Sequence, residues 1–129
     1  MKHLLKTTIV FILLVVMSSC SKDDVSTTQT IYGTWENISI DGGDTHYYKL
    51  IFAKKGGGGE VSSVEDSEGR LVSGHTDISW KVANEIVEVN TGSKVSSFYL
   101  NSSDQLVSQQ TGIVLDKVSE DYPDWYDGI

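Results

Sequence analysis

The chain has 129 residues, with 10 lysines and arginines against 18 aspartates and glutamates, for a formal net charge of −8. That length suffices for one small domain, and the acidic balance argues against nucleic acid as a partner. A single cysteine excludes an internal disulfide and any CxxC metal site.

The first 19 residues have the layout of a secretory signal peptide. Lys2, His3 and Lys6 precede an apolar run over residues 9–17, and Ser18 and Ser19 stand directly before the cysteine. The apolar run is much shorter than the roughly 20 residues that a membrane-spanning helix needs. We therefore expect residues 1–19 to be removed as a signal peptide.

Cys20 stands at the expected cleavage position and is predicted to carry the lipid of a bacterial lipoprotein. A lipidated cysteine with several acyl chains, palmitate among them, would anchor the protein stably to a membrane. Residues 20–24, Cys-Ser-Lys-Asp-Asp, resemble the start of Bacteroidota lipoproteins, which implies export to the outer membrane and its outer face. The alternative is that these charges are only a solvated spacer. Residues 20–30 are expected to be the lipidated cysteine and a flexible tether.

The remaining chain reads as all-β, because short β-branched and aromatic segments alternate with Gly, Asn, Asp and Ser. Ile78, Trp80 and Val82 face one side of the clearest strand, with polar residues between them. Breaks between strands are short, so neighbours are antiparallel, and an up-and-down meander of about eight strands would close into a small barrel. The predicted strands are 34–40, 46–53, 60–64, 76–83, 86–90, 94–100, 105–109 and 113–118.

Residues 31–119 are similar to the short lipocalin-like domains of Bacteroidota lipoproteins. The resemblance rests on the order of Gly33-Thr34-Trp35, Leu50 with Phe52 and the run Gly56 to Gly59, Trp80 with Val82, and Lys117-Val118. It implies a lipocalin-like barrel with a ligand at its mouth and Trp35 as a plug of the closed end, although the interpretation favoured for Trp35 is a core aromatic residue that organises packing. The span is much shorter than a full lipocalin, and an eight-stranded barrel is either filled by its own side chains or holds one small ligand.

Four aromatic residues are the candidates for lining a ligand cavity: Tyr48, Phe52, Trp80 and Phe98. The alternative for each is ordinary core packing. His46 and His75 have no partner at metal-ligand spacing and are expected at the surface or at the barrel rim. Residues 41–44, Asp-Gly-Gly-Asp, lack the remaining positions of a calcium loop and are interpreted as a hairpin turn. No catalytic residue, metal site or cofactor is predicted.

An acidic aromatic tail, residues 120–129, follows the predicted barrel. Asp121, Asp124 and Asp127 recur every three residues among the aromatic residues Tyr122, Trp125 and Tyr126. Exposed aromatic rings are favourable at interfaces, so these three are candidate interaction residues for a cation, a sugar or a protein. The alternative is that the tail folds back and caps the barrel with its rings.

These observations favour an outer-membrane-anchored, noncatalytic lipoprotein whose lipocalin-like domain binds a small apolar or amphipathic ligand. The alternative function is an envelope accessory protein that uses the barrel as a platform for a protein or glycan partner. An enzyme ranks third, because no catalytic signature is apparent in the sequence.

Overall fold

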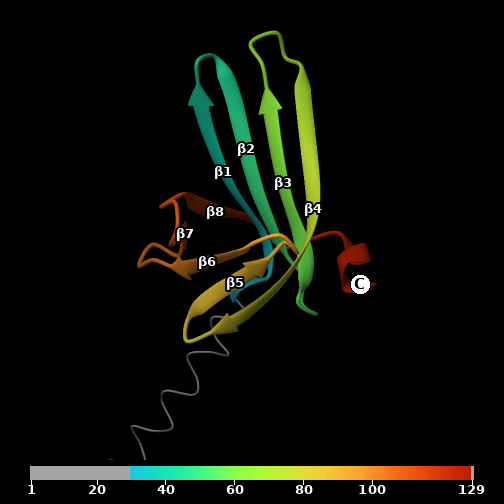
Figure 1. The fold of residues 1–129 in the computed structure, drawn as a ribbon, viewed down its shortest axis with the longest axis vertical. Helices are drawn as coiled ribbons and strands as arrows, with labels where there is room; N and C mark the ends of the chain where they lie inside the picture. Colours follow the sequence, from blue (N-terminus) through green and yellow to red (C-terminus); the bar gives the residue numbers. More distant parts are fainter. Residues whose placement is uncertain (1–29, 129) are drawn as a thin grey trace, which may run out of the picture.

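The structure is a computed structural model that describes residues 30–128 (Figure 1). The predicted signal peptide, Cys20 and the tether up to residue 29 lie outside the described residues, as does residue 129. Within residues 30–128, no helix is both long and apolar enough to span a membrane.

Eight antiparallel strands form a closed barrel in which each strand pairs with the next and the last pairs with the first. This confirms the predicted all-β, up-and-down architecture. A short 3-10 helix, η1, follows the last strand. The elements are β1 Gly33–Asp41, β2 Asp44–Phe52, β3 Gly57–Glu65, β4 Leu71–Ala83, β5 Ile86–Asn90, β6 Val95–Leu100, β7 Leu106–Ser108, β8 Val114–Ser119 and η1 Asp124–Gly128.

Four strands begin earlier than predicted, and the difference is largest for β3 and β4. The sequence predicted a turn over residues 56–59, but β3 begins at Gly57, and the turn lies before it, where Gly56 N–H donates to Ala53 O. These glycines pair with β2, and the pairing requires glycine at position 58 because a Cβ there would collide with the Ile51 carbonyl. β4 begins at Leu71 instead of residue 76, since its first residues pair with β3 without an apolar alternation to reveal them.

The barrel is asymmetric along its axis, because β1–β4 are long and β5–β8 are short. β8 pairs with β1 only at Thr34–Glu36, and β5 pairs with β4 only from Ser79 to Ala83. The remaining parts of β1–β4 rise as a four-stranded wall above the shorter half (Figure 1). We call the end of the barrel where β1 begins the closed end. The opposite end, from which this wall rises, is the mouth.

Aromatic residues fill the closed end. Trp35 is 1% exposed, its Nε1–H donates to the Ile31 carbonyl at 2.9 Å, and Lys117 Nζ lies 5.7 Å from its ring centroid. Trp80 packs edge-on against Phe52, with ring centroids 5.2 Å apart. Its Nε1–H donates to the carbonyls of Ala53 and Gly57, with Nε1 3.0 Å from each oxygen. The lower barrel is therefore filled by its own side chains.

Candidate functional site: a groove at the barrel mouth

The inner face of the wall holds a hollow of about 350 Å³. Register places most of its side chains on one face, because Asn37 lies opposite Tyr48, Ser39 lies opposite His46, and Tyr48 lies opposite Ser62. The hollow is lined by Asn37, Ser39, Asp41, His46, Tyr47, Tyr48, Ser62, Ser63, Val64 and Ile113.

A second hollow of about 310 Å³ lies beside the turns of the shorter half. Its lining comprises Tyr48, Lys94, Val95, Ser96, Phe98, Ser108, Gln110, Thr111 and Ile113. Tyr48 and Ile113 line both hollows, so the two adjoin at these side chains. We call the pair of hollows the mouth groove.

Tyr48 is held in place at the junction of the groove. Its hydroxyl donates to Glu60 Oε2 at 2.7 Å, from the neighbouring strand. Burial raises the pKa of Tyr48 well above its ordinary value of 10.0, and the hydrogen bond and negative charge of Glu60 raise it further. The phenol therefore stays neutral near physiological pH, and its ring orientation is fixed by the carboxylate.

This raised pKa predicts a loss of stability in alkali. A folded-state pKa above that of the unfolded chain gives a stability contribution that is complete below about pH 10 and falls as the pH rises further. Tyr48→Phe should therefore weaken the alkaline loss of unfolding free energy, measured by urea unfolding across that range. Tyr99→Phe, at an exposed site on β6, is the matched control. An unchanged pH dependence in Tyr48→Phe would contradict the prediction.

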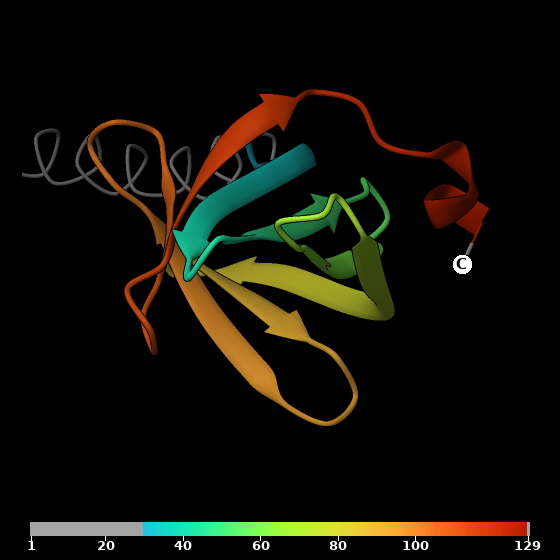
Figure 2. The same ribbon diagram turned by 90° about the horizontal axis from the view of Figure 1, so that it is seen from above.

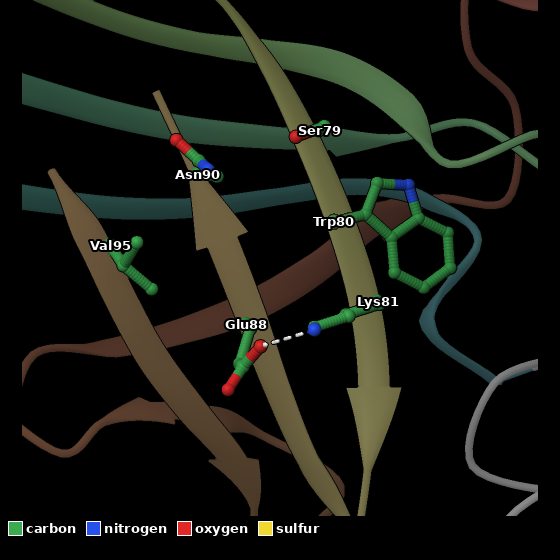
Figure 3. A pocket seen from close by; sticks show the side chains of 6 residues that line it. All are labelled: Ser79, Trp80, Lys81, Glu88, Asn90 and Val95. Atoms are coloured by element: carbon green, nitrogen blue, oxygen red, sulfur yellow. Dashed lines mark ion pairs between the residues drawn. The ribbon is translucent and has the colours of Figure 1, made fainter. Parts of the chain in front are cut away.

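A third hollow, of about 340 Å³, lies on the outer face of β4–β6. Figure 3 shows Lys81 reaching Glu88 there, with a Lys81 Nζ to Glu88 Oε2 distance of 3.3 Å. The Trp80 ring lies on the other side of β4 from the Lys81 ammonium (Figure 3). Both charged side chains are well exposed, so this ion pair contributes little energy.

The structure divides the four predicted ligand residues between two regions. Tyr48 and Phe98 border the mouth groove, although Phe98 is itself only 2% exposed. Phe52 is fully buried in the closed-end core, and Trp80 packs against it there while its segment also borders the outer hollow. Core packing thus accounts for Phe52 and for the Trp80 ring.

Sequence reasoning missed most of the polar groove residues. Asn37 and Ser39 follow Trp35 at a period of two, so strand alternation was a usable signal for placing them on its inner face. Gln110 belongs to the turn before β8, where no periodicity indicates which way a side chain points, whereas Ile113 is the first residue of the predicted strand 113–118, so alternation was a usable signal for it. They reach the groove only because the barrel closes.

The structure places His46 and His75 on opposite faces of the sheet and residues 41–44 in a turn. His46 lines the groove on the inner face, whereas His75 lies on the outer face of β4. Residues 41–44 form the predicted β1–β2 hairpin turn, with positive φ at Gly42 and Gly43. Among residues 30–128, no group of three or more His, Cys, Asp or Glu side chains is placed to hold a metal ion.

The sequence left open whether the acidic aromatic tail folds back and caps the barrel with its rings. The tail does fold back, but η1 lies outside the barrel (Figure 2). Tyr126, which is 1% exposed, packs with Ile51 and Ala53 on the outer face of the sheet. These apolar side chains, together with Val61, form the surface on which Tyr126 and Tyr122 of the tail pack.

Fold and groove together define a small, closed, up-and-down β-barrel with an open mouth. Comparison with protein-family models, with curated protein sequences and with solved structures gave no match.

Proposed function

We propose that this protein is an outer-membrane-anchored lipoprotein whose noncatalytic, lipocalin-like barrel binds one small amphipathic ligand at its mouth. The observation that carries the proposal is the meeting of two hollows at Tyr48 and Ile113 above a filled core. A concave site with apolar walls and a few placed polar groups is the usual form of a small-molecule site.

The lining of the groove supports an amphipathic ligand over a purely apolar one. Asn37, Ser39 and His46 present polar groups along the wall, whereas Val64 and Ile113 offer apolar surface. The closed-end core is packed with aromatic rings, so a ligand would rest on Tyr48 and Phe98 and would not enter the barrel deeply.

Native mass spectrometry tests this binding function directly. The protein, purified gently from the cells that make it, should carry a small molecule that denaturation releases. Ile113→Trp places a large ring at the junction of the two hollows and should abolish the bound mass. Val118→Trp is the matched control, because Val118 is exposed on β8 and lines neither hollow. Wild-type protein purified without any bound small molecule would count against the ligand-binding function.

The membrane anchor has its own test at Cys20, which lies outside the described residues. Incorporation of labelled palmitate should fall to background in Cys20→Ser, because the thioether to the lipid needs the thiol. Ser21→Ala, one residue along, should keep full incorporation. The Lys22-Asp23-Asp24 sequence supports export to the outer face of the outer membrane. Palmitate labelling that persists in Cys20→Ser would contradict the anchor.

A further inference from the structure

The acidic aromatic tail is fixed to the barrel through Tyr126, whose binding position between His75 and Gly59 we call the Tyr126 seat. The Tyr126 hydroxyl lies 2.8 Å from His75 Nε2 on β4. Gly59 on β3 leaves the room for this hydroxyl, because a Cβ there would collide with it and would come within 2.9 Å of His75 Nε2. The Tyr122 hydroxyl adds a second fixed point by accepting the Lys54 N–H at 3.1 Å.

This seat holds Trp125 at the surface in a defined orientation. The Trp125 ring stacks on Tyr126, with centroids 3.7 Å apart and planes inclined at 30°, yet the residue is 56% exposed. One face of the indole is therefore covered by a fixed ring, and much of the rest is open to solvent. Such preorganisation lowers the entropy that a binding surface loses when a ligand arrives.

A histidine ring borders the exposed indole, and a carboxylate lies beside that histidine. The His75 ring centroid lies 5.9 Å from that of Trp125. The Asp77 Oδ1 atom lies 3.7 Å from His75 Nε2, and its side chain is 69% exposed. We call the three residues Trp125, His75 and Asp77 the tail platform. It joins one flat apolar face to an imidazole and a carboxylate, from segments far apart in the sequence.

We infer that the tail platform binds a sugar ring of a neutral glycan, a function beyond the ligand proposed for the mouth groove. A pyranose has one apolar face that matches a single flat indole, and its hydroxyls donate to a carboxylate. One exposed ring offers far less than the roughly 800 Å² per partner that a stable protein interface buries. The net charge of −8 disfavours an acidic polysaccharide.

Tryptophan fluorescence isolates this surface. Of the three tryptophans, Trp35 and Trp80 are 1% and 8% exposed, so acrylamide should quench mainly Trp125. We expect at least one of the neutral probes cellohexaose, maltohexaose and chitohexaose to protect the purified protein from quenching. Trp125→Ala should weaken binding of that probe by at least about tenfold, measured by calorimetry, since buried aromatic contacts dominate binding energies.

Two further variants test the seat. Gly59→Ala should displace Tyr126 and weaken sugar binding, while circular dichroism confirms that the barrel remains folded. Tyr99→Ala removes an exposed aromatic residue on β6, outside the platform, and should leave binding unchanged. In Trp125→Ala the small molecule expected in the mouth groove should be retained, so the two proposals fail independently.

Several outcomes would overturn the inference. Protection by hexalysine and by none of the three sugars would show that the platform recognises cations over its indole face. Absence of protection by every probe, or sugar binding that survives in Trp125→Ala, would equally reject it.

Discussion

Gly58→Ala should destabilise the barrel by about 3 kcal/mol, at the upper end of the cost of overpacking a filled interior. A Cβ at this position would collide with the Ile51 carbonyl of the paired strand and would approach Ile78 Cγ1 to 3.3 Å. The backbone carbonyl cannot move aside without breaking the β2–β3 ladder, in which Gly58 lies opposite Phe52. Relief would therefore cost strand pairing beside the core.

Urea unfolding followed by circular dichroism measures this effect. Gly74→Ala is the matched control, since it adds the same methyl group to a neighbouring strand. There the nearest atom to the new Cβ, the Ser62 carbonyl oxygen, is 4.0 Å away. Gly74→Ala should leave the unfolding midpoint nearly unchanged. Equal midpoints for the two variants would contradict the close approach of β2 to Gly58.

Trp35→Ala should destabilise the protein by about 3–5 kcal/mol, the usual cost of truncating a fully buried tryptophan. The side chain is 1% exposed, it lies beneath Lys117, and its Nε1–H is the donor to the Ile31 carbonyl. Truncation would leave a cavity at the closed end and an unpaired carbonyl. Both effects act on the core that closes β1 against β8.

Two comparisons separate these contributions. Trp35→Phe keeps an aromatic ring but loses the donor, so it should cost about 1–3 kcal/mol through the unpaired carbonyl. Trp125→Ala removes the same side chain from a half-exposed site and should cost only about 0.5–1.5 kcal/mol, through its lost stacking on Tyr126. Similar losses in Trp35→Ala and Trp125→Ala would show that Trp35 does not organise the core.

The contrast between these tryptophans explains how far the sequence could predict the site. Period-two alternation placed Trp80 inside the barrel, and the structure confirms it, because a strand has only two faces. Alternation does not predict whether an inward residue lies near the closed end or near the mouth of the barrel. Tyr48 and Phe52 are both inward on β2, yet one lines the groove and the other is sealed in the core.

The sequence by itself determined that the chain is all-β and how its strands pair. Short polar breaks allow only antiparallel neighbours, and alternating apolar residues define one buried face. Tertiary structure alone decided the unequal strand lengths, the mouth groove and the position of the tail. The groove depends on the closure between β1 and β8, and the Tyr126 seat on the missing Cβ of Gly59. These are contacts between distant segments, which local patterns do not encode.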